Sequence, residues 1–167
     1  RVVAADPPDF ILVVGDVNST LAAALVAAKR LIPLGHVEAG LRSNDRTMPE
    51  EVNRMVTDIL SDLCFTTSLD AEPNLLREGV APGKIRFVGN VMIDSLLKHR
   101  QRARDTSTVL ADLAVAPKRY VVVTLHRPSN VDEPEGLTGI LGALGRLAEE
   151  RTVLFPVHPR TRGRIAE

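Results

Sequence analysis

Short apolar runs of strand length alternate with segments of helical periodicity along most of the chain. Residues 10–14 are continuously apolar and stop at Gly15-Asp16, as expected of a strand that is covered on both faces. Residues 18–30 follow with the alanines and leucines of a helix. Because strand, helix and strand in succession are typical of a parallel sheet with helices on its faces, the sequence predicts an α/β fold.

The same alternation predicts the other elements of secondary structure. We expect strands at residues 32–37, 63–67, 85–88, 120–125 and 152–157, and helices at residues 49–60, 71–78, 92–104, 134–150 and from 161 onward.

The pattern restarts after a polar segment at residues 105–119, which we interpret as a linker. Residues 1–104 are then the C-terminal part of one Rossmann-like domain, and residues 120–167 the N-terminal part of a second. The chain begins without Met and both of its ends fall in helical patterns. We therefore interpret it as an internal piece of a larger enzyme, with both domains truncated.

Charge and composition exclude several classes of partner. The chain has 21 basic and 21 acidic residues, which gives no electrostatic reason to expect binding to nucleic acid or to a membrane surface. It contains neither an apolar run of the ~18 residues that a membrane span needs nor a signal-peptide pattern. The single cysteine, Cys64, lies in an apolar run, so we expect a core residue and a protein of the reducing cytoplasm.

Four polar side chains follow predicted strands: Asp16, Glu38, His126 and His158. In open parallel sheets, ligands bind at the carboxyl ends of the strands. Each residue also has a structural interpretation, which is a turn or cap for Asp16, a solvated carboxylate for Glu38 and a hydrogen-bonded loop residue for each histidine.

The connection from Glu38 to the next helix is unusually polar. Glu50 and Glu51 lie in the first turn of the helix that begins at Pro49, where the helix dipole favours acids by ~0.3–1 kcal/mol. That effect alone could explain both residues. Arg54 follows one turn after Glu50, so a surface ion pair is the alternative to a functional role.

The fifth predicted strand is followed by an imidazole beside a guanidinium, His126-Arg127. This pair suits a phosphate or diphosphate, for which arginine offers a bidentate fork. The sequence has neither a Gly-x-Gly-x-x-Gly nor a phosphate-loop motif, and its acids and histidines lack the spacing of metal ligands. We therefore expect no bound cofactor and no catalytic metal.

Taken in order and spacing, these segments resemble the non-hydrolysing UDP-N-acetylglucosamine 2-epimerases over essentially the whole chain. The segments that carry the resemblance are Gly15-Asp16, His36-Val37-Glu38-Ala39-Gly40-Leu41-Arg42, Pro49-Glu50-Glu51-Val52-Asn53-Arg54, Gly89-Asn90-Val91-Met92-Ile93-Asp94, His126-Arg127 and Pro156-Val157-His158.

The resemblance implies a glycosyltransferase-B-like fold that interconverts UDP-GlcNAc and UDP-ManNAc for polysaccharide biosynthesis, as a homodimer without a cofactor. The reaction it implies is anti elimination of UDP to 2-acetamidoglucal, followed by re-addition of UDP. It assigns catalytic roles to Asp16, Glu38, Glu50 and His126, and leaves open which carboxylate is the base. It assigns binding of the nucleotide sugar to Arg54, Arg127 and His158, and leaves open whether His158 contacts the substrate or lies at the activator site that some members possess.

The chain also departs from that family. Pro128-Ser129 stands where many members have Arg-Glu, which affects sugar specificity and any activator contact. The N-terminal Gly-Thr-Arg-Pro-Glu and the later Asp-Ser-Gly-Gly segments of the family are absent, so we expect the 167 residues alone not to epimerise. A hydrolysing epimerase, a glycosyltransferase of the same fold and a non-catalytic nucleotide-sugar-binding module remain alternatives.

Overall fold

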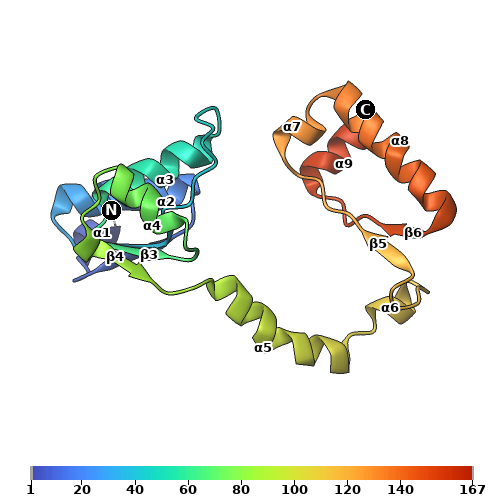
Figure 1. Cartoon of the computed structure of the whole chain (residues 1–167), viewed down its shortest axis with the longest axis horizontal. Helices are drawn as coiled ribbons and strands as arrows, with labels where there is room; N and C mark the ends of the chain where they lie inside the picture. Colours follow the sequence, from blue (N-terminus) through green and yellow to red (C-terminus); the bar gives the residue numbers. More distant parts are fainter. Residues whose placement is uncertain (1, 167) are drawn as a thin grey trace. The chain divides into compact units, whose positions relative to one another are not determined.

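The computed structural model describes residues 2–166 (Figure 1). The chain divides after Arg100 into two compact units, and each contains parallel strands and helices, so the predicted α/β class is confirmed. Among the described helices, none is long and apolar enough to cross a membrane.

The first unit is a four-stranded parallel sheet in the order β1-β2-β3-β4. Because all four strands run parallel, their carboxyl ends lie at one edge of the sheet. Its strands are β1 (Ile11–Val14), β2 (Leu34–Ala39), β3 (Leu63–Thr66) and β4 (Ile85–Phe87). Its helices are α1 (Val2–Ala5), α2 (Asn18–Arg30), α3 (Pro49–Leu60), α4 (Ala71–Arg77), a 3-10 turn at Pro82–Lys84, and α5 (Val91–Thr106), which continues past Arg100.

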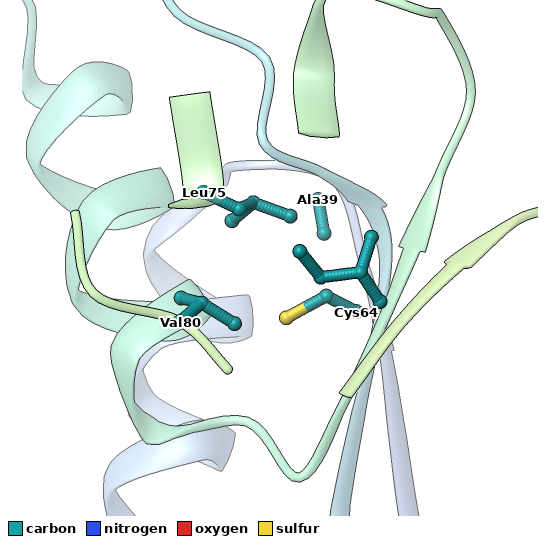
Figure 2. Close-up of a cluster of buried hydrophobic side chains, with 5 residues drawn as sticks. Ala39, Cys64, Leu75 and Val80 are labelled. Atoms are coloured by element: carbon teal, nitrogen blue, oxygen red, sulfur yellow. The ribbon is translucent and has the colours of Figure 1, made fainter. Parts of the chain in front are cut away.

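Two apolar clusters hold this sheet to its helices. One joins Val13 and Leu34 of the sheet to Ala24 and Ala27 of α2. The other, shown in Figure 2, consists of Ala39, Cys64, Leu75, Val80 and Ile85. The prediction that Cys64 is a core residue is confirmed, because its side chain is fully buried. Burial, with a smaller contribution from the charge of Asp58, raises the pKa of its thiol to about 12.

Helix α3 departs in part from what its hydrophobic pattern indicates. Its apolar residue Leu60 packs against the cluster of Val13 and Leu34, but Val52 and Ile59 are 44% and 56% exposed. The buried residues of α3 are Glu51, Asn53, Thr57 and Asp58. Except for the Thr57 hydroxyl, these side chains have hydrogen-bond partners at the edge of the sheet, which offsets the cost of burying them.

Gly40 lets the chain leave β2 and turn toward α4. Its φ is +79°, and a Cβ atom there would lie 2.5 Å from the backbone oxygen of Ala71.

Gly40→Ala should therefore lower the free energy of unfolding by about 3 kcal/mol, measured by urea denaturation. Gly79 is the control, because its φ is +88° but nothing lies within 4 Å of its Cβ position. Gly79→Ala should cost only about 1 kcal/mol, and equal losses in the two variants would contradict the steric argument.

The second unit has two parallel strands, β5 (Tyr120–Val122) and β6 (Thr152–Leu154). Both end three residues before the predicted limits. The segment after β5 is tied down by Thr161, a fully buried residue whose Oγ1 donates to the Leu125 carbonyl oxygen at 2.7 Å. The helices of this unit are α6 (Val109–Asp112), α7 (Pro128–Val131), α8 (Pro134–Glu150) and α9 (Pro159–Ala166).

The predicted linker at 105–119 is only partly irregular. It contains the last residues of α5 and all of α6. The assignment of residues 1–104 and 120–167 to two separate Rossmann-like domains stays a prediction.

Candidate active site at the carboxyl edge of the first sheet

The turn after β1 is fixed to β2 through both peptide groups that flank Gly15. Gly15 has a φ of +70°, a conformation that glycine adopts without strain. Its N–H donates to the Val37 carbonyl oxygen at 3.1 Å, and its own carbonyl oxygen lies 2.9 Å from Nε2 of His36. Asp16 is the next residue, so its main chain starts from a constrained position.

Arg54 joins two carboxylates at this edge. Its Nε and Nη2 donate to Oδ2 of Asp16 at 2.9 and 2.6 Å, and its Nη1 donates to Oε2 of Glu51 at 2.9 Å. Its neighbour Asn53 donates to the Asp16 carbonyl oxygen at 2.8 Å. Arg54 is therefore ion-paired with Asp16, one of the predicted catalytic acids. The surface ion pair with Glu50 that helical spacing suggested is not formed.

Glu51 anchors the loop between β2 and α3. It is 2% exposed and accepts hydrogen bonds from the backbone N–H groups of Ser43 and Asn44, each at 2.9 Å. Burial on its own would raise the pKa of Glu51, but these hydrogen bonds and the one from Arg54 outweigh burial and lower it. The carboxylate is thus held ionised beside the Asp16–Arg54 pair.

The lowered pKa of Glu51 predicts a pH-dependent contribution to stability. A carboxyl whose pKa is lower in the folded chain stabilises it above the ordinary value of 4.5, and this contribution is lost as the pH falls through the folded value. Glu51→Gln should lower the free energy of unfolding at pH 7 by about 1–3 kcal/mol, and the deficit should shrink in acid. Urea denaturation at pH 7 and pH 4 measures both. Glu50→Gln is the matched control, since Glu50 is exposed, and a pH-independent deficit for Glu51→Gln would contradict the assignment.

Glu38 occupies an irregular position in β2. The pairing register with β3 shifts between Val37 and Ala39, and Glu38 has a φ of +71°, which is uncommon for a residue with a side chain. Such shifts turn a side chain away from its regular direction. Its Oε2 lies 3.9 Å from the point that a Cβ atom on Gly15 would occupy. Glu38 is therefore directed over the β1 turn, inside the strand and not after it as predicted.

The three predicted acids differ in their surroundings. Asp16 is ion-paired, whereas Glu38 and Glu50 make no hydrogen bond or ion pair among the side-chain interactions of the described residues. Glu38 is half-buried and Glu50 is exposed. The structure thus brings Asp16 and Glu38 together around Gly15, while Glu50 contacts neither of them.

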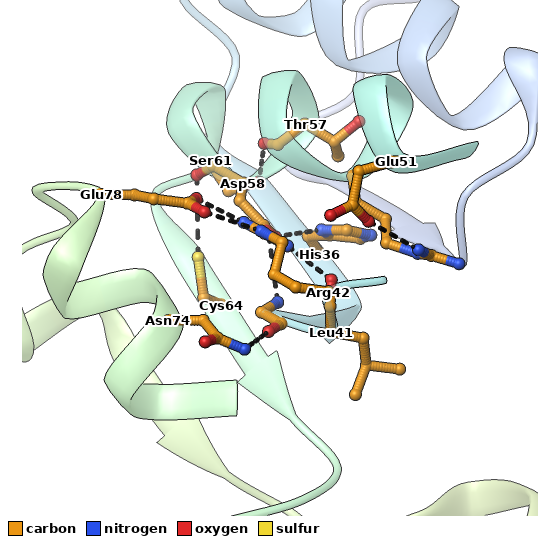
Figure 3. A network of polar contacts seen from close by, with 12 residues as sticks. His36, Leu41, Arg42, Glu51, Thr57, Asp58, Ser61, Cys64, Asn74 and Glu78 are labelled. Atoms are coloured by element: carbon orange, nitrogen blue, oxygen red, sulfur yellow. Dashed lines mark hydrogen bonds and ion pairs between the residues drawn. The ribbon is translucent and has the colours of Figure 1, made fainter. Parts of the chain in front are cut away.

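A second network lies beneath this edge and was missed from the sequence (Figure 3). Asp58 is fully buried, and its Oδ1 lies 2.6 Å from Nδ1 of His36. Its Oδ2 accepts from the Gly40 N–H at 3.0 Å and from Nη2 of Arg42 at 2.8 Å. Arg42 also donates two hydrogen bonds to the Glu78 carboxylate, from Nε at 2.8 Å and from Nη2 at 2.5 Å. Burial would lower the pKa of Arg42, but Glu78 and Asp58 outweigh it and raise it.

The second unit places two predicted residues together. The rings of His126 and His158 are 6.2 Å apart, centroid to centroid, with an angle of 43° between their planes. Nδ1 of His126 also lies 3.5 Å from Oγ1 of Thr124. Arg127 precedes α7 and is exposed. No group of three or more potential metal ligands occurs among the described residues.

A family profile and individual known proteins that match this chain all point to the same family. The sequence profile described as "UDP-N-acetylglucosamine 2-epimerase" matches residues 1–167. The UDP-N-acetylglucosamine 2-epimerase of Methanocaldococcus jannaschii is 42% identical over 171 residues, with 100% of this chain and 47% of that protein covered. The UDP-2,3-diacetamido-2,3-dideoxy-D-glucuronate 2-epimerase of Pseudomonas aeruginosa is 46% identical over 167 residues, with 98% of this chain and 46% of that protein covered.

Solved structures agree with these relatives. The crystal structure of the Methanocaldococcus jannaschii enzyme in complex with UDP-GlcNAc and UDP has a TM-score of 0.89 at 42% identity, covering 99% of this chain and 46% of that one. The Neisseria meningitidis enzyme bound to UDP-GlcNAc has a TM-score of 0.85 at 29% identity, covering 98% and 47%. These matches confirm the predicted glycosyltransferase-B-like fold class. The chain spans about half the length of the curated relatives it matches.

Proposed function

We propose that this chain, which belongs to the UDP-N-acetylglucosamine 2-epimerase family, supplies the acidic side of an active site that inverts C2 of UDP-GlcNAc. The observation that carries the proposal is the strand-end cluster in which Arg54 fixes Asp16 while Glu38 has no side-chain partner within residues 2–166. Relatives with structures in complex with UDP-GlcNAc support the choice of substrate.

The chemistry needs carboxylates in two different states. In the elimination step the C2–H and C1–O bonds break, a C1=C2 bond forms, and UDP leaves with the bonding electrons. Re-addition of UDP and return of a proton to the other face of C2 give UDP-ManNAc. A group on one face must take the proton from C2, a group on the other face must return one, and a carboxylate must stay negative beside the anomeric carbon, where positive charge develops.

We assign these roles from the partners of each carboxylate. Arg54 donates two hydrogen bonds to Asp16, which hold its carboxylate in place, so Asp16 suits the electrostatic role. Glu38 is paired with no cation among the described residues and sits on a backbone held in an unusual conformation, a feature that recurs at functional sites. Glu38 therefore suits proton transfer at C2. Glu50 is exposed in the first turn of α3, and we propose that it contacts the sugar from there.

The second unit has the groups suited to the diphosphate. His126 and Arg127 follow β5, and His158 lies beside His126. We propose that His126 and Arg127 contact the diphosphate of the substrate, and that His158 contacts the substrate or an activating UDP-sugar. A cytoplasmic homodimer acting in polysaccharide biosynthesis completes the proposal.

One relative supports a second substrate. The Pseudomonas aeruginosa relative is named for a 2,3-diacetamido glucuronate sugar, and this chain has Pro128-Ser129 directly after His126-Arg127. The UDP-linked 2,3-diacetamido-glucuronate is therefore the alternative to UDP-GlcNAc. In both cases the reaction at C2 is the same.

Incubation of the full-length protein with each UDP-sugar in deuterated water tests the proposal by NMR. The expected result is deuterium at C2 together with the epimeric UDP-sugar. Release of free ManNAc and UDP would indicate a hydrolysing enzyme. Binding without deuterium incorporation from either sugar would overturn the proposal in favour of a non-catalytic module or a transferase.

A further inference from the structure

We infer that His36 is a positioning residue for Asp16, held as an imidazolium between the Asp58 carboxylate and the Gly15 carbonyl oxygen. The inference rests on the proposed function only in taking Asp16 as a catalytic group. The charge state of His36 and its hold on the β1 turn follow from the geometry of the buried network alone.

The two ring nitrogens of His36 both face acceptors. The residue is fully buried, Nδ1 lies 2.6 Å from Oδ1 of Asp58, and Nε2 lies 2.9 Å from the Gly15 oxygen. A carbonyl oxygen only accepts, so Nε2 must carry a proton. A neutral ring would then present a bare Nδ1 to Asp58, and only a second ring proton or a protonated Asp58 satisfies that contact.

Asp58 is the ionised partner. Its other oxygen accepts from the Gly40 N–H and from Arg42, and hydrogen bonds of this kind favour a carboxylate. With His36 charged, the chain Glu78–Arg42–Asp58–His36 has no net charge. With His36 neutral, it would have one unbalanced negative charge in a buried setting, which is costly.

Two further cations near the network, Arg54 and Lys84, are paired with carboxylates of their own, and the other ionisable groups around His36 in the described part of the chain do not oppose a positive charge. Cys64 on β3 is paired in register with His36, and its raised pKa keeps the thiol neutral. Glu38 lies two residues further along β2, and Asp16 follows the very residue that His36 contacts. Both are acids, so their charges favour the cation.

The hold on Gly15 fixes the direction of Asp16. His36 fixes the peptide group before Asp16 through the Gly15 oxygen, and Asn53 fixes the peptide group after it through the Asp16 oxygen. With both peptide planes constrained, the Asp16 side chain leaves the main chain toward Arg54. Loss of the His36 contact frees the first of these planes, and misplacement of a reacting group by about 1 Å can cost about 100-fold in rate.

The charge of His36 is tested by ¹⁵N NMR of the full-length protein at neutral pH. We expect protons on both ring nitrogens of His36. In Asp58→Asn, the amide can donate to Nδ1, so His36 should become neutral with its proton on Nε2 and its contact to Gly15 kept. An unprotonated Nδ1 in the unmodified protein would overturn the inference.

The positioning role is tested with His36→Gln and a matched control, His99→Gln, since His99 is exposed on α5. For His36→Gln we expect kcat to fall about 100-fold with KM changed less than about threefold. Loosening of the turn should also weaken the neighbouring hydrogen bond from the Gly15 N–H to Val37, so the Gly15 amide should exchange its hydrogen faster than in His99→Gln. A fall confined to KM, or unchanged amide exchange, would overturn the role. If the unmodified protein turns over neither sugar, the proposed function fails, while ring protonation and amide exchange still decide the inference about His36.

Discussion

Glu38→Gln in the full-length protein is expected to lower kcat for deuterium incorporation at C2 by about 10²–10⁴-fold, with little change in the Kd of UDP-GlcNAc. Glutamine keeps the size of the side chain and cannot take up a proton. Because Glu38 has no ion pair or hydrogen bond within the described residues, its replacement breaks no structural contact. The loss should therefore fall on the chemical step and not on folding.

NMR of C2 deuteration measures the rate, and calorimetric titration with UDP-GlcNAc measures the affinity. Glu72→Gln is the control, because it makes the same substitution at an exposed glutamate in the first turn of α4; its kcat should be unchanged. Asp16→Asn separates the two carboxylates. Full exchange in Glu38→Gln with loss of exchange in Asp16→Asn would assign proton transfer to Asp16.

The order of strands and helices was predictable because it depends on local patterns. Apolar runs such as 10–14 and 63–67 are the parts of the chain that a sheet can bury on both faces, and they became β1 and β3. The first and last residues of each strand were less predictable where tertiary contacts decide them. β2 begins at Leu34, after Pro33, which has no N–H to donate, and it continues through Glu38 to Ala39 by means of a register shift that no local pattern indicates.

The site was partly predictable for the same reason. Strand ends predicted the neighbourhood of Asp16 and Glu38, and of His126 and His158, and the structure brings each pair together. Which of Glu50 and Glu51 is buried could not be predicted, since adjacent helix residues point about 100° apart and two of the apolar residues of α3, Val52 and Ile59, are exposed. The buried polar face of α3 is stabilised by partners from β2 and its loop.

The buried network has one signal in the sequence. His36 interrupts a predicted strand that is otherwise apolar. A polar residue at a position that the pattern assigns to the core needs a partner. His36 therefore predicts a buried partner, but Asp58 lies off the apolar stripe of α3, so its identity as that partner and its link to Arg42 and Glu78 depend on the folded chain.

Arg42→Met is expected to produce the largest loss of stability, about 3–5 kcal/mol in the free energy of unfolding at pH 7. The Arg42 side chain is 3% exposed, and among the described residues it is the one arginine that donates to Asp58, which is fully buried. Methionine fills much of the same space but leaves Asp58 short of one donor and Glu78 without its fork. Urea denaturation of Arg42→Met and of Arg46→Met, a substitution at an exposed arginine in the same loop, measures the difference, and Arg46→Met should change stability by less than about 0.5 kcal/mol.

A double variant identifies the cause of that loss. If the cost of Arg42→Met comes from a buried charge left without a partner, then removing the charge as well should recover stability. Asp58→Asn in the Arg42→Met background is therefore expected to be about 1–2 kcal/mol more stable than Arg42→Met alone. Lost packing of the arginine stem would instead make the two losses add. Additive losses would contradict the view that the network is held by matched charges, and a recovery would show that Asp58 needs Arg42 chiefly because its carboxylate is ionised.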